Sequence, residues 1–201
     1  MSSSNFEITR GNMKLIKSNF LTCLTLFSYQ LSAIEFKECR IGSENGSEKL
    51  KAECATFAVP ENRENTSRMI DLNMAIIRSK ATEKLADPVI MLAGGPGQSA
   101  VESYVGVSYA FREILKNRDV VLVDQRGTGK SNPLKCEFDE SIQEKLLLDP
   151  ELIYPELEKC VNNLEADTRY YTTMESIKDL EEVRKALKIE NIEFEGGRHR
   201  A

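Results

Sequence analysis

Two short apolar runs, Val89–Leu92 and Val120–Val123, stand in the middle of the chain and are rich in β-branched side chains. Each run is followed by a cluster of glycines, which is typical of a buried parallel strand. Residues 100–116 between them are long enough for the crossover helix that two parallel strands require. The pattern therefore predicts a βαβ unit with a glycine-rich loop at the carboxyl end of each strand. In open α/β sheets, ligands bind at these ends.

The segment that precedes this unit alternates between apolar and polar residues. Its apolar positions are Ile70, Leu72, Met74 and Ile76. This alternation predicts a half-buried antiparallel strand. Residues 55–59, which end at Pro60, predict a second strand beside it, and the polar segment 39–54 predicts a loop or a loose hairpin.

The segment that follows the unit changes character twice. Residues 132–169 hold three prolines and helical fragments at 141–148 and 157–164, and we expect them to form an excursion packed on the sheet. A capping box then begins at Thr172, and an apolar stripe with helical spacing predicts a core-facing helix that ends near Lys188. The stripe comprises Met174, Ile177, Leu180, Val183 and Leu187. Residues 191–195 would form the next parallel strand.

The loops after the two apolar runs read Ala-Gly-Gly-Pro-Gly at 93–97 and Asp-Gln-Arg-Gly-Thr-Gly-Lys-Ser at 124–131. The end of the second loop is similar to a phosphate-binding P-loop. That motif requires a glycine where this chain has Asp124, and a carboxylate would repel a phosphate. Pro133 and Cys136 also follow where an amphipathic helix should begin, so we reject a nucleotide-binding function.

Taken together, the two loop motifs resemble the prolyl aminopeptidase (proline iminopeptidase) branch of the α/β-hydrolases, above all its secreted, cysteine-containing members. The similarity spans roughly residues 39–197 and continues weakly through 170–173 and 179–184. The family often has histidine where this chain has Ala93. The resemblance implies a partial α/β-hydrolase fold, namely the N-terminal half of a mostly parallel sheet with flanking helices. It also implies hydrolysis of N-terminal residues from peptides, with a peptide as substrate of the intact relative.

By the same resemblance, Gly94 and Gly95 contribute to an oxyanion hole, because glycine lets backbone N–H groups approach a developing negative charge. A plain tight turn at a strand end is the alternative for this loop. Four residues of the second loop are expected to form a structural polar turn, namely Asp124, Arg126, Gly127 and Ser131. The side chains of Asp124, Arg126 and Ser131 are expected to satisfy backbone groups there.

The family's nucleophile belongs in a Gly-x-Ser-x-Gly turn directly after the next strand. Here the chain reads Gly-Gly-Arg-His-Arg-Ala at 196–201, so that Arg198 occupies the expected nucleophile position. His199 fits a solvated tail, and the acid and base of the family would follow Ala201. We therefore expect a truncated domain that has no catalytic residue and is inactive. A frameshift or misjoined gene end is one hypothesis, and a non-catalytic binding module or a decaying remnant is the alternative.

The first 33 residues have the features of a secretory leader. Lys14 and Lys17 precede an apolar stretch at 20–31, and Ala33 offers a small residue for cleavage. Met13 fits as the true start. We therefore divide the chain into a leader, 1–33, and a hydrolase domain, 34–201, which is exported to the periplasm or the cell exterior. An amphipathic or buried N-terminal helix is the alternative.

Cysteine usage agrees with export. Outside the leader the chain has Cys39, Cys54, Cys136 and Cys160, which allow three disulfide pairings. The pairing of sequence neighbours, 39 with 54 and 136 with 160, closes short loops. Four reduced cysteines in a cytosolic protein are the alternative. No Cys-x-x-Cys or histidine lies at ligand spacing, so we expect neither a metal site nor a cofactor.

Composition narrows the partners. The chain has 27 Lys and Arg residues against 32 Asp and Glu residues. It has no basic patch with interleaved aromatic residues, so nucleic acid is not an expected partner. It also has no apolar run long enough to span a membrane once the leader is removed.

Overall fold

The computed structural model describes residues 34–43, 46, 49–95, 97–138, 142, 145 and 149–196. Several sequence predictions fall outside these residues. They are the leader 1–33, the helical fragment 141–148 in large part, Pro96 of the first glycine loop, and the end of the chain with Arg198 and His199.

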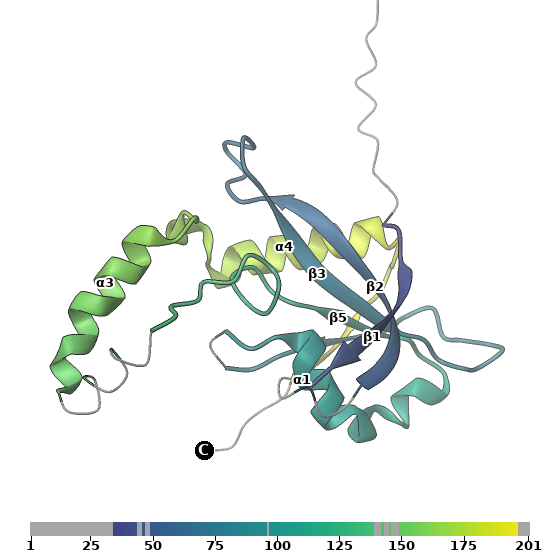
Figure 1. Cartoon of the computed structure of the whole chain (residues 1–201). Helices are drawn as coiled ribbons and strands as arrows, with labels where there is room; N and C mark the ends of the chain where they lie inside the picture. Colours follow the sequence, from purple (N-terminus) through teal and green to yellow (C-terminus); the bar gives the residue numbers. More distant parts are fainter. Residues whose placement is uncertain are drawn as a thin grey trace, which may run out of the picture. The chain divides into compact units, whose positions relative to one another are not determined.

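The described residues form a six-stranded sheet with the order β1-β2-β3-β5-β4-β6 (Figure 1). The strands are β1 (Lys37–Gly42), β2 (Lys49–Pro60), β3 (Met69–Ile77), β4 (Val89–Leu92), β5 (Val120–Val123) and β6 (Glu193–Gly196). The pairs β1–β2, β2–β3 and β3–β5 are antiparallel, whereas β4 pairs in parallel with both β5 and β6. The predicted partial α/β fold is confirmed. The described strands form a mixed sheet and not a mostly parallel one, because three of their five pairs are antiparallel.

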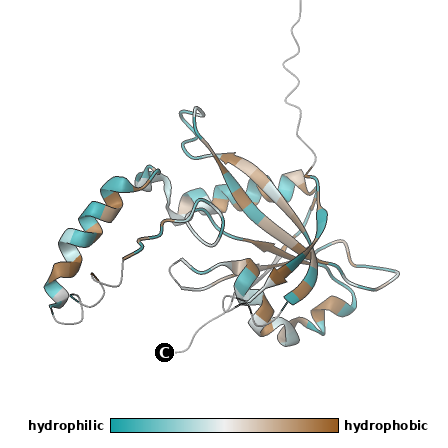
Figure 2. Cartoon of the chain, in the orientation of Figure 1, coloured by the Kyte–Doolittle hydropathy of each residue, from teal (hydrophilic) through white to brown (hydrophobic). Residues whose placement is uncertain are grey.

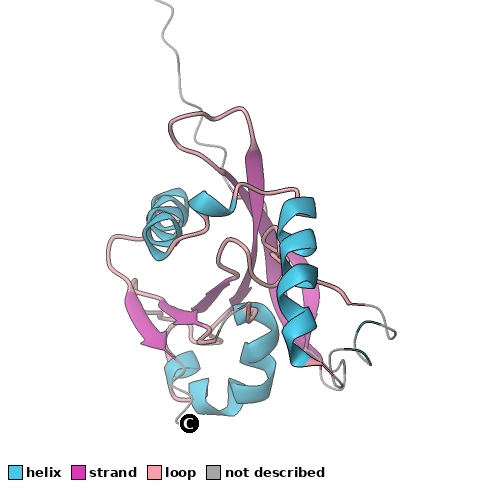
Figure 3. Ribbon diagram, turned by 90° about the vertical axis from the view of Figure 1, so that its left-hand side faces the viewer, coloured by secondary structure: helices cyan, strands magenta, loops and turns pink. Residues whose placement is uncertain are grey.

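Helices cover the two faces of this sheet. On one face, α1 (Ala100–Val107) packs its buried side chains Val101, Tyr104 and Val105 against β4 and β5. On the other face, α4 (Thr173–Ala186) contributes Leu180 and Val183 to a second apolar cluster with β3 and β5. Figure 3 shows these helices on different sides of the strands.

The predicted crossover helix over 100–116 is broken into three pieces. Helix α1 is followed by two short 3-10 helices, η1 (Ser108–Phe111) and η2 (Ile114–Lys116). Gly106 lies just before the break, and glycine weakens the interior of a helix.

Helix α4 begins as the capping box predicted, because the Thr172 side chain accepts a hydrogen bond from the backbone N–H of Glu175 (3.3 Å). The predicted apolar stripe is only partly correct. Met174 and Ile177 are 62% and 52% exposed. The buried face instead comprises Ser176, Asp179, Leu180 and Val183. Its first half is polar because Asp179 binds a buried arginine from another element, as described below.

The segment between β5 and α4 contains η3 (Pro150–Leu152), α3 (Ile153–Asn163) and η4 (Thr168–Tyr170). Helix α3 confirms the helical pattern that the sequence shows at 157–164. None of its residues is buried, so this helix does not pack on the sheet as we expected. Figure 2 shows apolar positions on α3, and the most exposed aliphatic side chain among them is that of Val161, which is 49% exposed.

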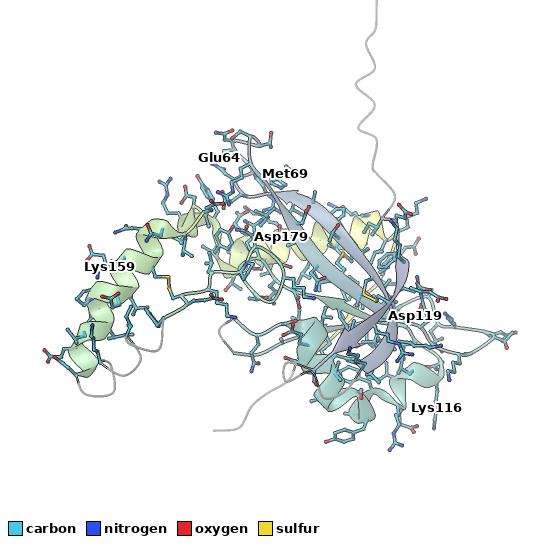
Figure 4. The ribbon with its side chains drawn as sticks, viewed as in Figure 1. Glu64, Met69, Lys116, Asp119, Lys159 and Asp179 are labelled. Carbon is cyan, nitrogen blue, oxygen red and sulfur yellow. A yellow bond between two sulfur atoms is a disulfide. The ribbon has the colours of Figure 1, made fainter. Side chains whose placement is uncertain are left out.

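Two disulfides join the cysteines that are neighbours in sequence, Cys39 with Cys54 and Cys136 with Cys160. The first bridge lies in the β1–β2 hairpin, where Cys39 stands opposite Ala52, so the bridged cysteines are diagonal neighbours on one face. The second bridge ties α3 to the segment after β5 (Figure 4). Among the described residues, no helix has the length and apolar character that crossing a bilayer requires.

Candidate functional site

The two glycine loops meet at the point where the strand order reverses. From β4 the chain crosses through α1 to β5 on one side, and then passes through α4 to β6 on the other side of β4. The carboxyl end of β4 is therefore the topological switch point, where open α/β sheets bind ligands. Residues 93–99 follow β4 and residues 124–131 follow β5, so both loops lie at this edge.

Asp124 joins these loops. Its side chain is fully buried. One carboxylate oxygen, Oδ1, accepts hydrogen bonds from the Ser99 hydroxyl (2.8 Å) and the Val101 backbone N–H (3.1 Å). The other, Oδ2, accepts from the Asn73 amide (2.8 Å) and the Lys130 backbone N–H (3.2 Å). One carboxylate thus holds the start of α1, the loop after β5 and strand β3 together.

Ser131 closes the second loop onto the same strand. Its hydroxyl donates to the Asp124 carbonyl oxygen (2.7 Å) and accepts from the Asn73 backbone N–H (2.8 Å). The Gly127 backbone N–H donates to the Ser131 carbonyl oxygen (2.7 Å). Asn73 reaches this point because β3 runs antiparallel to β5, so the first half of β3 lies beside the end of β5. The turn therefore satisfies its own polar groups.

Close packing around Asp124 explains a glycine of the second loop. Gly129 has a φ of 51°. A Cβ at this position would lie 2.3 Å from Asp124 Oδ2 and 2.8 Å from the Ser99 Cβ. Any larger residue would separate the carboxylate from its donors.

The first loop offers unpaired backbone donors. Gly95 adopts a φ of 112°, which only glycine adopts readily. Within the described part of the chain, the backbone N–H groups of Gly94 and Gly95 have no acceptor. The Gly95 carbonyl oxygen accepts from the Gln98 N–H (3.4 Å), so the carbonyl and the two amides have separate roles in the turn. Two amides at a switch point could bind an anion or an oxygen with developing negative charge.

A cavity of about 440 Å³ lies beside these loops. Residues of both loops, of α1 and of the segment after the second loop line it, including Gly97, Ser99, Glu102, Gly129 and Lys135. Among these residues, Glu102 contributes a carboxylate and Lys135 an ammonium group. The cavity can therefore accommodate a polar ligand next to the first loop.

Arg126 of the second loop is buried and reaches α4. Its Nε and Nη2 donate to the two carboxylate oxygens of Asp179 in α4 (2.6 and 2.7 Å). Its Nη1 donates to the carbonyl oxygens of Glu61 (2.9 Å) and Tyr170 (2.8 Å). The guanidinium is fully engaged in structure, so it is not available to a ligand.

Arg63 adds a second cation to the same carboxylate. It binds Asp179 (2.7 Å), Glu182 (2.9 Å) and Glu175. Burial opposes the charged form of Arg63, but the hydrogen bonds to Asp179 and Glu182 outweigh it and raise the pKa of the guanidinium.

Sequence reasoning missed three members of this region, Asn73, Ser99 and Arg63. Asn73 occupies an ordinary polar position of an alternating strand, and only its side-chain amide in the middle of that strand hints at a partner. Ser99 stands directly before a helix, which is the usual place of an N-cap, and its hydroxyl does accept from the Glu102 N–H (3.0 Å). Arg63 lies in a polar turn and gives no signal. No group of three or more His, Cys, Asp or Glu side chains in the described ranges could hold a metal ion.

Comparison with known proteins gives relatives whose names all describe hydrolytic enzymes. No family model matches the chain. It is 28% identical over 171 residues to YuaR of Escherichia coli (strain K12), whose name describes a hydrolase, covering 77% of this chain and 34% of that protein. It is 34% identical over 107 residues to carboxylesterase B of Mycobacterium tuberculosis (strain H37Rv), covering 52% and 20%.

A third relative is the serine protease Hip1 of the same Mycobacterium strain, which is 26% identical over 183 residues, covering 81% of this chain and 34% of that protein. The chain thus spans about a third of the length of YuaR and of Hip1.

Proposed function

We propose that this chain is the N-terminal portion of an exported serine peptidase of the α/β-hydrolase type that removes N-terminal residues from peptides, a proposal supported by the loop motifs at 93–97 and 124–131 and by relatives that are named as hydrolases. Its role in that enzyme is to supply oxyanion donors from residues 93–97. One observation carries this proposal: the unpaired N–H groups of Gly94 and Gly95 lie at the switch point, in a loop whose following helix is anchored by Asp124.

The proposed chemistry is acyl transfer. When a nucleophile attacks a carbonyl carbon, negative charge develops on the carbonyl oxygen. The Gly94 and Gly95 amides would donate to that oxygen, and each such donor is worth about 10²–10³ in kcat in enzymes of this type. The buried hydrogen bonds of Asp124 fix Ser99 and the first turn of α1, so the loop between β4 and α1 is anchored at both ends before substrate binds. Preorganisation of this kind is what makes such donors effective.

The peptide as substrate is supported by the loop motifs and by the serine protease among the relatives. Another relative, carboxylesterase B, is named for the hydrolysis of esters, which are also acyl compounds. Both fit one oxyanion hole, since peptide and ester hydrolysis pass through a similar tetrahedral intermediate.

The 201-residue chain itself would not catalyse this reaction. A serine needs a neighbouring base to become a nucleophile. The two buried serines beside the site, Ser99 and Ser131, already use their hydroxyls to bind Asp124 and Asn73. The sequence contains a single histidine, His199, and by the resemblance Arg198 stands where the prolyl aminopeptidases have their nucleophilic serine.

Export is supported by the leader-like residues 1–33 and by the two disulfides, since disulfides persist in oxidising compartments. An alkylation assay on protein taken from intact cells tests this part. Blocked thiols at residues 39, 54, 136 and 160 are expected, and free thiols at these positions would contradict export.

The nucleotide sequence that follows the codon for Ala201 tests the enzymatic proposal. Translated in its three frames, it should encode Gly-x-Ser-x-Gly, followed by Asp or Glu and then His. If none of the frames encodes this order, the peptidase proposal fails, and a non-catalytic binding module becomes the better description of the chain.

A further inference from the structure

A groove of about 1020 Å³ opens at the other end of the sheet, where β4 and β5 begin. It forms because β2 and β3 diverge. Their ladder ends at the Glu53–Ile76 pair, whereas β2 continues back to Lys49 in contact with β1 alone. The segment 78–81 after β3 forms a second wall, and Leu115 and Lys116 of η2 form a third. The groove is thus separate from the glycine loops, which lie at the carboxyl ends of β4 and β5.

This groove is strongly basic within a chain of net charge −5. Six cationic side chains line it against two carboxylates, Glu38 and Glu53. The cationic residues are Arg40, Lys51, Arg78, Lys80, Arg112 and Lys116. Lys116 and Asp119, which are labelled in Figure 4, mark this part of the molecule.

Some of these cations already have partners. Arg78 binds Glu53 (2.7 Å) and Asp119 (2.9 Å), and Lys116 binds Glu113 (2.6 Å). By contrast, the side chains of Arg40, Lys51 and Lys80 form no ion pair or hydrogen bond with any described residue. Among the described residues, three positive charges in the groove are therefore unmatched.

Two of the unmatched cations face each other. Arg40 of β1 and Lys51 of β2 are directly opposite in the antiparallel ladder. Like charges at such positions destabilise a sheet. An anion between them would reverse this cost, and the guanidinium of Arg40 has the geometry for two parallel hydrogen bonds to a carboxylate.

The groove also exposes an unpaired strand edge. Residues 49–52 of β2 pair with β1 on one side and have no strand on the other among the described residues. The adjoining surface is apolar, with the partly buried side chains of Ala52, Ile77 and Leu115. An extended peptide can add to such an edge through backbone hydrogen bonds, while its side chains reach pockets on either side.

We propose that this groove binds an extended acidic peptide segment, which adds to the free edge of β2 and places its carboxylates against Arg40, Lys51 and Lys80. Four edge residues offer about 13 Å of strand. The free edge favours a peptide over an anionic membrane, because a lipid headgroup cannot pair with a row of backbone donors and acceptors as a strand does. The competing explanation for the lysines is that they protect the edge strand, because lysines on such a strand also prevent unwanted pairing between sheets.

The binding test uses fluorescence anisotropy of the 201-residue chain with a labelled peptide that alternates glutamate and valine. The acidic peptide should bind, and a lysine–valine peptide of the same length should not. Lys51→Glu and Lys80→Glu should each weaken binding roughly fivefold to tenfold. Lys80 lies outside the strands, so its variant tests the proposal even if Lys51→Glu disturbs the hairpin. The matched control is Lys159→Glu on α3, whose lysine binds only Glu156 and should not affect the affinity.

A peptide of the same charge with N-methylated alternate amides separates strand addition from simple charge attraction. It should bind at least tenfold more weakly, because its backbone cannot pair with β2. Equal affinity of the N-methylated peptide, equal weakening by the Lys159 variant, or no binding of the acidic peptide would each overturn the proposal. So would vesicles of phosphatidylglycerol that bind through Lys51 and Lys80 when the acidic peptide does not.

Discussion

Arg126 and Asp179 form a buried two-point ion pair, with Nε to Oδ2 at 2.6 Å and Nη2 to Oδ1 at 2.7 Å. It joins the loop after β5 to the helix that precedes β6. Asp124 anchors the same loop from the other side, through Ser99 and Asn73. The loops at the switch point are thus held between both faces of the sheet by two carboxylates.

Asp179→Asn should lower the free energy of unfolding by about 3–5 kcal/mol, because Arg126 would keep a buried charge without a counterion. Urea denaturation followed by circular dichroism measures this change. Lys178→Gln is the matched control, since Lys178 is half exposed and binds only Glu175. A loss below about 1 kcal/mol for Asp179→Asn would show that the pair does not stabilise the loop.

Gly129→Ala should destabilise the chain by roughly 3 kcal/mol or more, because its Cβ would overlap Asp124 Oδ2 and disrupt a buried polar network. Gly46→Ala is the control. Gly46 also has a positive φ of 70°, but a Cβ there would meet nothing within 4 Å. That variant should cost only the backbone strain of about 1 kcal/mol. Equal losses in urea denaturation would mean that the space around Asp124 is not the cause.

The two disulfides should differ in their effect on stability. The Cys39–Cys54 bridge joins paired strands and spans 15 residues, so replacing both cysteines by alanine should cost about 3 kcal/mol. The Cys136–Cys160 bridge holds a helix that buries none of its residues. Its loss should change global unfolding little and instead speed proteolysis within residues 136–164. Equal effects of the two double variants on the urea midpoint would contradict this difference.

Tyr171 should ionise late in an alkaline titration. Burial, together with its hydrogen bond to Glu61 (2.9 Å), raises the pKa of Tyr171 to about 12, and burial raises the pKa of Tyr104 to about 12. Since folding favours the neutral phenols, their contribution to stability is full below about pH 10 and is lost as the pH rises toward 12.

Absorbance at the phenolate band follows this ionisation. Tyr171→Phe should remove part of the late step, whereas Tyr154→Phe, which removes an exposed tyrosine, should leave that step intact. A late step of unchanged size in Tyr171→Phe would show that the Tyr171 phenol is not held by Glu61.

The sequence predicted the centre of the sheet to the residue, because Val89–Leu92 and Val120–Val123 are short, buried and closed by glycines. It predicted the face of α4 less well. Apolar periodicity places Met174 and Ile177 in the core, but the buried face turns toward Ser176 and Asp179 so that Arg126 has a counterion. The apolar periodicity of a sequence cannot predict that a polar residue is buried when its partner lies far away in the chain.

The candidate site shows the same limit. Glycine clusters after two strands were sufficient to find both loops. The residues that join the loops, Asn73 and Ser99, could not be found, because their spacing from Asp124 reflects the folded sheet and not a local motif. Four cysteines allow three disulfide pairings, and the structure has the one between sequence neighbours, which the sequence analysis singled out because it closes short loops.

Labelling of the purified chain with a fluorophosphonate probe tests most directly the proposal that this chain has no activated serine nucleophile of its own. We predict no labelling above that of the denatured chain, with a known serine protease as positive control. Covalent labelling of the folded chain, traced by mass spectrometry to a serine such as Ser99 or Ser131, would contradict the account.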